Sequence, residues 1–367
     1  MLLLLLLTGC WDRHELDERA NSLMTGVDLC SEQEDCFLIS SRQYAIPGRI
    51  PTGPGGRSST DAVMVVSSPG KDGPDSRTRA QAEMARDLHF GHQRMLLWGE
   101  AFARQELRTY LDYVWRVPEI RRQMWVAVVE GRAEDVVRAR PPLDPVPALY
   151  LSDQFEEAVE TGRLPAQSTL GDFMVRLAGQ GEEPFAPLLR LAPPYPEIVG
   201  LAVFREARMV GKLNGQELST FLLLAGGRRT SQRLEVATSD GQVAWIELTG
   251  RAARYRIRWE QNRVHANVAL SLEGDLAAGT PGVTGSDSAT LRLMEQRAAT
   301  EVSRLAGALL TRLQQEYRSD ILGLGARVRA FHPAVWRQIP DWPAAFAAAR
   351  FDFEVTVHVR RTGPVMD

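Results

Sequence analysis

The chain ends with a segment in which apolar and polar residues alternate. From 351 to 360 every odd position holds Phe or Val, and every even position holds a polar or charged residue. Successive side chains of a strand point to opposite faces of a sheet, so this period predicts a strand with one buried face. The segments 233–238, 242–248, 254–259 and 264–272 are also strand-like. Because the connections between them are short, we expect them to pair antiparallel.

A long helix is predicted to cover the buried face of that sheet. Ser286 or Ser288 can cap its N-terminus, and apolar residues recur at helical spacing as far as Tyr317. A coiled coil is the competing interpretation, but Ala298 and Ala306 would make a thin seam and no long heptad register holds. We therefore expect a core helix with a stripe formed by Leu291, Met294, Ala298, Val302, Leu305, Leu309, Leu313 and Tyr317.

The first part of the chain mixes strand-like and helical segments, which favours a sheet with helices packed on it. Strands are predicted at 23–29, 37–44, 62–67, 95–98, 124–129, 188–191, 201–204 and 208–213, and helices at 76–88, 99–117, 133–140, 148–160, after Thr169 and at 214–224. Prolines at 193, 194 and 196 mark the predicted domain boundary. We expect domains at 10–192, which can comprise more than one lobe, and at 197–367. The predicted fold class is mixed α+β: multi-lobed, mostly antiparallel sheets packed with helices, and a C-terminal block with one long helix on an antiparallel sheet.

The N-terminus has the pattern of a lipoprotein signal peptide. Leucines from Leu2 to Leu7 are followed by Thr8, Gly9 and Cys10. Six leucines are too few to span about 30 Å of hydrocarbon, which takes about 20 apolar residues. We therefore predict a leader at 1–9, cleavage before Cys10 and lipidation of Cys10, with a true start that lies further upstream. A buried apolar N-terminus with an incidental cysteine is the alternative.

Two further cysteines, Cys30 and Cys36, flank a polar turn between two strand-like segments. A hairpin could bring their Cα atoms within the roughly 4.4 to 6.8 Å that a disulfide requires. An extracytoplasmic location would permit the bond. The sequence leaves a disulfide and two free thiols open, and it signals no metal site with these cysteines because no other Cys or His pair lies nearby.

The sequence carries no recognisable catalytic motif. Nucleophile-elbow, P-loop, zinc-protease and dinucleotide-binding patterns do not occur in it. His89 and His92 are three residues apart, but Gly91 lies between them and no third ligand is signalled, so structural histidines are expected. We predict no catalytic residues, no cofactor and no metal. A net charge of -3 gives no basic field for nucleic acid.

Arg254, Arg256 and Arg258 alternate with Tyr255, Ile257 and Trp259. In a strand this alternation places the three guanidinium groups in one row on the exposed face. We predict that this row is a partner-binding surface.

Taken together, these motifs resemble those of the Ger(x)C family, the lipoprotein C subunits of nutrient germinant receptors in spore-forming bacteria. The matching residues follow one another along almost the whole mature chain. They are Gly9-Cys10-Trp11-Asp12-Arg13, Glu15-Leu16, Gly99-Glu100, Pro118-Glu119-Ile120-Arg121, Ala202-Val203-Phe204, Val210-Gly211-Lys212-Leu213, Ser319-Asp320-Ile321-Leu322-Gly323-Leu324-Gly325, Trp336, Asp341-Trp342 and Arg361-Thr362-Gly363. The short leader, the pair Cys30 and Cys36 and a Gly/Pro-rich insertion after Pro47 depart from the family pattern.

The resemblance implies a non-enzymatic subunit that Cys10 holds on the outer face of the spore inner membrane. It also implies two integral-membrane receptor subunits, of the A and B types, as partners. The second hypothesis is a solute-binding lipoprotein that presents a small ligand to a membrane transporter. It would require a cleft between lobes that is lined by converging polar groups.

Overall fold

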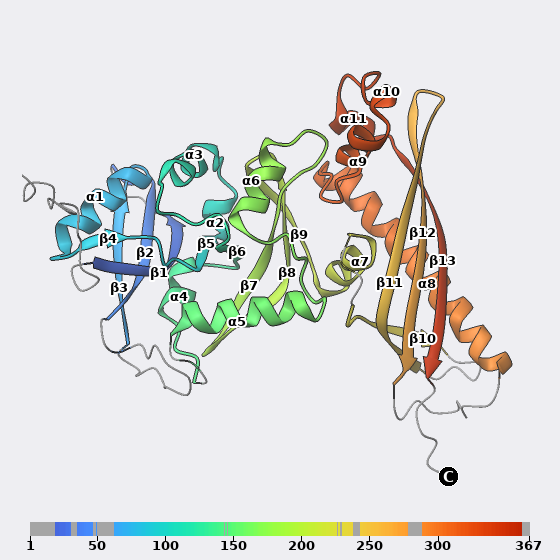
Figure 1. The fold of residues 1–367 in the computed structure, drawn as a ribbon, viewed down its shortest axis with the longest axis horizontal. Coiled ribbons are helices and arrows are strands. Elements are labelled where there is room, and N and C mark those ends of the chain that lie inside the picture. The colour runs from blue at the N-terminus through green and yellow to red at the C-terminus, as the bar shows by residue number, and fades with distance from the viewer. Residues whose placement is uncertain are drawn as a thin grey trace, which may run out of the picture.

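The computed structural model describes residues 19–30, 35–46, 49, 62–142, 144, 146–225, 227, 230–237, 243–277 and 288–361. These residues form an elongated molecule with two β-sheets, one toward each end (Figure 1). The predicted leader at 1–9 and the predicted lipidation site Cys10 lie outside the described residues.

The N-terminal sheet has nine strands in the order β3-β2-β1-β5-β6-β7-β8-β9, with β4 paired to β1 beside that path. Its centre is parallel, from β1 through β5 and β6 to β7, and the strands of the main path on either side pair antiparallel. The strands are β1 (Arg19–Leu29), β2 (Leu38–Ala45), β3 (Val63–Gly70), β4 (Asp87–His89), β5 (Met95–Gly99), β6 (Trp125–Val129), β7 (Phe185–Ala192), β8 (Tyr195–Arg205) and β9 (Arg208–Leu213).

Helices cover both faces of this sheet, which explains why β5 and β6 are continuous apolar runs. Met95 and Leu97 of β5 share a core with α4 (Ala133–Arg138) and α5 (Pro147–Glu160). Leu96 and Trp98 face a second core with α2 (Glu100–Ala103), α3 (Arg108–Arg116) and α6 (Leu170–Ala178). The Trp98 ring meets the Phe173 ring of α6 edge to face, with centroids 5.1 Å apart.

Two predicted helices of this part differ from the structure. The helix α1 (Gly73–Glu83) is capped by Asp72, and residues 87–89 form β4 where the sequence suggested helix. The predicted helix at 99–117 is divided into α2 and α3. The backbone N–H of Leu107 donates to the Ala207 carbonyl (3.0 Å), so tertiary contact interrupts the helix there.

The C-terminal sheet has four strands in the order β10-β11-β12-β13. They are β10 (Arg233–Ala237), β11 (Val243–Glu260), β12 (Arg263–Leu276) and β13 (Arg350–Arg361). The helix α8 (Ser288–Thr311), which continues as a π-helical segment η2 (Arg312–Tyr317), covers one face, as predicted. The closing strand differs from the antiparallel expectation, because β13 pairs parallel to β12. The helices between β12 and β13 return the chain to the end of the sheet at which β12 begins, so the two strands run parallel. Alternation of apolar and polar residues predicts a strand but does not tell in which direction it runs.

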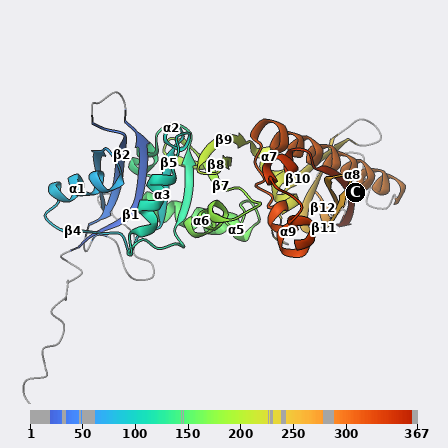
Figure 2. The same cartoon turned by 90° about the horizontal axis from the view of Figure 1, so that it is seen from above.

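The remaining helices lie near the junction of the two sheets. They are α7 (Gly215–Ala225), α9 (Leu324–Phe331), α10 (Pro333–Trp336) and α11 (Trp342–Ala347). In both ribbon views α7 lies between the sheets (Figures 1 and 2). The predicted boundary at Pro193–Pro196 falls within the β7–β8 hairpin. The N-terminal sheet therefore continues to Leu213, and the change of sheet comes later than the prolines suggested.

Candidate functional site

The motif Ser319–Gly325 forms the turn that follows η2, and a buried carboxylate organises it. Asp320 is 2% exposed. It accepts hydrogen bonds from the backbone N–H groups of Leu324 (3.1 Å) and Gly325 (2.9 Å) and from the indole N–H of Trp342 (3.0 Å). Burial raises the pKa of Asp320 to about 6, against the lowering effect of these donors. Because its oxygens are occupied by structural donors, Asp320 stabilises the turn and is poorly placed to accept a substrate proton.

This turn packs directly against the connection between α6 and β7 of the N-terminal sheet. A Cβ atom added to Gly325 would lie 2.6 Å from the Gly181 Cα and 2.4 Å from the Trp342 ring. The Ala326 N–H donates to the Gly181 carbonyl (2.8 Å), and Arg176 donates to the Ile321 carbonyl (3.3 Å). We call these contacts the Asp320 junction. At this junction the backbone of Gly325 and Ala326 lies directly against the backbone of Gly181.

A second contact joins the two parts beside the Asp320 junction. The Tyr317 hydroxyl donates to the Lys212 carbonyl of β9 (2.9 Å). Gly211 makes room for this ring, since a Cβ atom there would lie 2.1 Å from it. The structure thus brings the family motif 210–213 against Tyr317, which lies two residues before the motif 319–325.

Lys212 also organises charges at the end of the parallel strands. Its Nζ lies 2.6 Å from the Glu100 carboxylate and 3.1 Å from the Glu130 carboxylate. Burial raises the pKa values of both carboxyl groups, but hydrogen bonds from Lys212, from Arg104 to Glu100 and from Arg190 to Glu130 outweigh it and hold them below the ordinary range. This edge of a parallel sheet is where α/β proteins often bind ligands. Here its carboxylates are ionised and paired.

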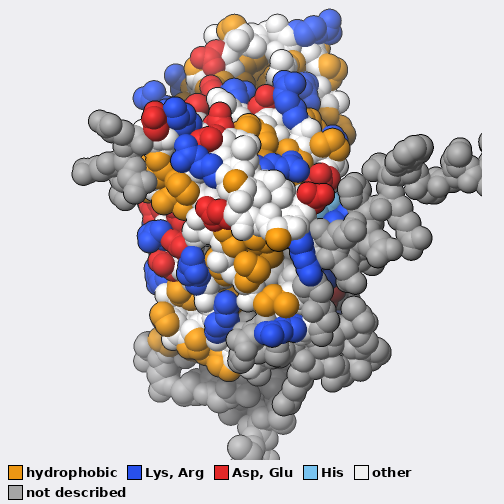
Figure 3. Space-filling model, turned by 90° about the vertical axis from the view of Figure 1, so that its left-hand side faces the viewer, with side chains coloured by type: hydrophobic (Ala, Val, Ile, Leu, Met, Phe, Trp, Pro, Cys, Tyr) orange, Lys and Arg blue, Asp and Glu red, His pale blue; other side chains and the backbone are white. Residues whose placement is uncertain are grey.

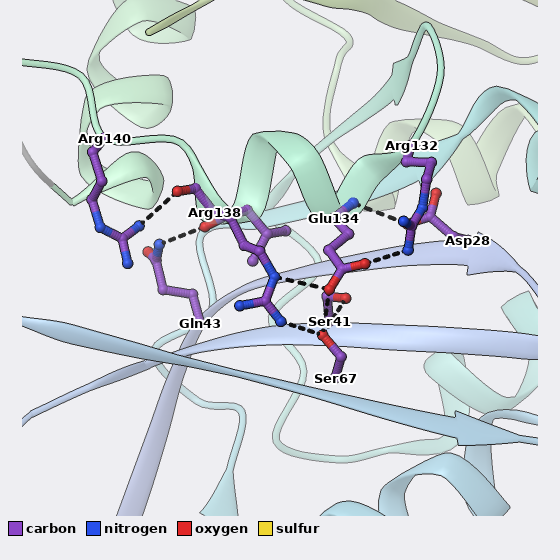
Figure 4. A network of polar contacts seen from close by, with 9 residues as sticks. Asp28, Ser41, Gln43, Ser67, Arg132, Glu134, Arg138 and Arg140 are labelled. Carbon is purple, nitrogen blue, oxygen red and sulfur yellow. Dashed lines mark hydrogen bonds and ion pairs between the residues drawn. The ribbon is translucent and has the colours of Figure 1, made fainter. Parts of the chain in front are cut away.

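A polar network that the sequence did not predict links β1, β3 and α4 (Figure 4). Asp28 is 4% exposed and accepts hydrogen bonds from the backbone N–H groups of Ala133 (2.7 Å) and Glu134 (2.9 Å). Burial raises the pKa of Asp28, while these two donors lower it. The Glu134 carboxylate accepts from the Ser67 hydroxyl (2.8 Å) and from Arg138 (2.8 Å). The only signal in the sequence was an acidic residue inside an apolar strand.

The structure joins Cys30 and Cys36 by a disulfide with a Cα–Cα distance of 5.9 Å. The bond closes the β1–β2 hairpin, where the Cys30 N–H also donates to the Phe37 carbonyl (3.0 Å). His89 and His92 lie side by side, with ring centroids 6.0 Å apart, and His89 faces Glu119 (3.6 Å). Among the described residues no group of three or more potential ligands could hold a metal ion.

The predicted arginine row lies on the exposed face of β11. Arg254, Arg256 and Arg258 are exposed, whereas the residues between them are half-buried. Arg258 is 3.8 Å from Glu260. β10 pairs only with residues 243–247 of β11, so the row lies on the part of the strand beyond β10.

The described surface also contains an apolar hollow of about 500 Å³ between α1 and α3. Phe102, Tyr110, Tyr113 and Val117 contribute to its lining. It lies within the N-terminal part and not between the two sheets. On the end face drawn in Figure 3, hydrophobic patches are interspersed with basic and acidic side chains. Within the described ranges no helix is both long and apolar enough to cross a membrane.

Glu183, next to the Asp320 junction, should make stability depend on pH. Burial raises the pKa of Glu183 to about 7, above its ordinary 4.5. The folded protein therefore holds a proton that the unfolded chain releases, so this stabilisation is complete below pH 4.5 and disappears as pH rises through 7. We expect Glu183→Gln to be more stable than the native protein by about 1–3 kcal/mol at pH 8 and equally stable at pH 4.5, measured by urea unfolding.

Glu197→Gln is the control for removal of one carboxylate charge, because the Glu197 side chain is exposed on β8. Equal stability differences for Glu183→Gln at pH 4.5 and pH 8 would contradict the raised pKa. The amide oxygen of glutamine can still accept the hydrogen bond that Glu183 receives from the Glu206 N–H (2.6 Å), so the substitution keeps this contact.

Comparison with known proteins covers both parts of the chain. Residues 12–191 match the family described as "Spore germination protein N-terminal domain", and residues 199–363 match "Spore germination B3/ GerAC like, C-terminal". Spore germination protein KC of Bacillus subtilis (strain 168) is 22% identical over 99% of this chain and 94% of its own length. Spore germination protein GerQC of Bacillus cereus is 20% identical over 82% of this chain and 83% of its own length.

The fold is similar to that in the crystal structure of the GerBC protein, with a TM-score of 0.59 and 15% identity over 91% of this chain and 96% of that chain. This likeness extends over both sheets and supports the mixed α+β fold class. From the two family matches, which together account for nearly all of the described residues, we conclude that this chain belongs to the GerAC-like family of spore germination proteins.

Proposed function

We propose that this chain is a lipid-anchored, non-catalytic subunit of a spore nutrient germinant receptor. Cys10 would carry the lipid and hold the protein on the outer face of the spore inner membrane, where it docks with two integral-membrane subunits. The observation that carries the proposal is the pair of family matches at 12–191 and 199–363. The carboxylates of Asp320, Glu100 and Glu130 are all engaged in structural contacts, which supports a docking role over a catalytic one.

The physical role of the anchor is to confine the folded part to the membrane plane. Confinement raises its effective concentration near membrane-embedded partners without any new contact. The disulfide between Cys30 and Cys36 is consistent with an extracytoplasmic location, where such bonds persist.

Cys10→Ala tests the anchor directly. We expect the variant to keep the native melting temperature while the membrane-bound fraction falls about tenfold or more, because no acyl chain remains. Receptor assembly and nutrient-triggered germination should fall with it. Cys30→Ala with Cys36→Ala is the control, since it removes both cysteines of the disulfide, leaves no free thiol there and keeps the anchor. Normal germination with a fully soluble Cys10→Ala protein would refute the proposal.

We also propose that the row Arg254, Arg256 and Arg258 contacts a partner subunit. Arg256→Glu should weaken receptor assembly and leave the melting temperature within about 2 °C of the native value, because an exposed surface change rarely alters stability. Arg292→Glu on α8 is a matched exposed control. A large fall in melting temperature for Arg256→Glu would instead assign the row a structural role.

A solute-binding lipoprotein is the second candidate. The hollow between α1 and α3 has room for a small ligand, but it is apolar and lies within one part of the molecule, unlike the polar cleft between lobes that this candidate requires. At the Asp320 junction the two sheet-containing parts are in direct contact, so the described residues leave no cleft between the parts at that place. A rise in melting temperature on addition of amino acids or sugars to the isolated protein would support this candidate.

A further inference from the structure

The C-terminal sheet ends in a long strand with a free edge. β13 comprises 12 residues and pairs on one side with β12. Among the described residues no strand pairs with its other side, and it forms the margin of the sheet in Figure 1. An unpaired edge presents a row of backbone donors and acceptors to any strand that can approach it.

One hydrogen bond shows which backbone groups face this free edge. The Val359 N–H donates to the Glu295 carboxylate of α8 (2.9 Å), so it points away from β12. Backbone groups alternate in direction along a strand, and the same side therefore carries the N–H and C=O groups of Phe353, Val355 and Val357. An antiparallel partner would bond to these odd residues. The even residues would then face each other as non-hydrogen-bonded pairs.

The even residues from 352 to 360 of β13 are ordered by charge, after Arg350 at the start of the strand. Asp352 and Glu354 stand before Thr356, and His358 and Arg360 follow it, all with exposed side chains. Two antiparallel copies centred on Thr356 would oppose Asp352 to Arg360 and Glu354 to His358. Opposite charges across a strand pair stabilise it, and like charges destabilise it.

Neighbouring registers keep only part of this match. Centring on Val357 would oppose Glu354 to Arg360 but would leave Asp352 without a partner within the described residues. Centring on Val355 would oppose Arg350 to Arg360, and centring on Glu354 would oppose that carboxylate to itself. The register centred on Thr356 gives both acidic side chains of β13 a basic or imidazole partner within the described residues. The neighbouring strand holds some of these side chains in place: Arg360 pairs with Glu273 (2.6 Å), and Glu354 accepts a hydrogen bond from Asn267 (2.7 Å).

We propose that two copies of this chain associate through β13, antiparallel and across a two-fold axis at Thr356, so that their four-stranded sheets become continuous. The partner is a second copy because the strand is complementary to itself. A two-fold interface uses the same surface on both molecules. A single strand pair is a small interface and gives weak association in free solution. The proposal does not depend on the lipid anchor.

Cross-linking through one introduced free cysteine tests the axis, since Cys30 and Cys36 are joined to each other. In the full chain with Cys10→Ala, the variant Thr356→Cys should form a disulfide-linked dimer under mild oxidation, because non-hydrogen-bonded pairs have a Cα–Cα distance of about 4.5 Å. Glu354→Cys and His358→Cys are the controls. Each would lie about 13 Å from its own copy, four residues along the strand, and should cross-link about tenfold more slowly. A mixture of these two variants should cross-link like Thr356→Cys.

Charge reversal then tests the register. Adding Asp352→Arg and Glu354→Arg to Thr356→Cys should slow cross-linking about tenfold, and adding Arg360→Asp and His358→Asp as well should restore it. Circular dichroism of each variant confirms folding. Cross-linking of Thr356→Cys no faster than that of the two controls, or cross-linking that charge reversal leaves unchanged, would overturn the proposal.

Discussion

Replacement of Asp320 by alanine is expected to lower the free energy of unfolding by about 3–5 kcal/mol. The carboxylate accepts hydrogen bonds from Leu324, Gly325 and Trp342 in a site that water does not reach. Its removal leaves three buried donors without an acceptor, and each unsatisfied group costs about 1–3 kcal/mol. Urea unfolding followed by tryptophan fluorescence measures the loss, since the Trp342 indole is one of the donors.

Asp341→Ala is the matched control for Asp320→Ala. Asp341 is also an aspartate that accepts from a backbone N–H, that of Ala344 (3.4 Å), but it is exposed at the start of α11. Loss of an exposed cap of this kind costs about 1 kcal/mol. If Asp320→Ala were no more destabilising than Asp341→Ala, the junction would not depend on the buried carboxylate.

Asp28→Ala is expected to cost about 2–4 kcal/mol, the second-largest effect. The substitution leaves the N–H groups of Ala133 and Glu134 without their buried acceptor and detaches the start of α4 from β1. Gly99 fits closely beside this carboxylate, since a Cβ atom there would lie 2.0 Å from Asp28 Oδ1. The vacated space would therefore be polar and poorly filled.

Asp135→Ala on the same helix is the control, because Asp135 is exposed in the first turn of α4. It should change stability by no more than about 0.5–1 kcal/mol. Chemical denaturation of both variants at one pH compares them. Equal losses would show that the stability of α4 depends on its general charge and not on the two bonds to Asp28.

Several strands and helices of the fold could be predicted from the local pattern of apolar and polar residues. The strand-like segment at 264–272 and the alternation at 351–360 predicted β12 and β13, and the apolar stripe from Leu291 to Tyr317 predicted α8 with η2. These predictions are confirmed because one buried face imposes its period directly on the sequence. The break between α2 and α3 and the parallel pairing of β13 did not follow, since a contact with Ala207 and a crossover connection determine them.

The junction could be predicted only in part. The motif Ser319–Gly325 stood out through the family resemblance, but its pairing with Trp342 and with Gly181 depends on tertiary contact. Asp28 and Glu134 are 106 residues apart. Glu134 has local partners in Arg132 and Arg138, but they do not reveal that its backbone N–H binds Asp28. The role of each of these carboxylates depends on its burial. The burial of a single acidic residue cannot be predicted from the periodic pattern of apolar residues in the sequence.

The continuation of the N-terminal sheet to Leu213 limits how the protein can be dissected or recombined. A fragment that stops at residue 191 would lose β8 and β9 and leave the side of β7 unprotected. A fragment that starts at residue 199 would carry a severed hairpin whose apolar side chains, such as Phe204, have lost their covering layer. Chimeras between relatives should therefore exchange material after residue 213, where no strand ladder of this sheet is cut.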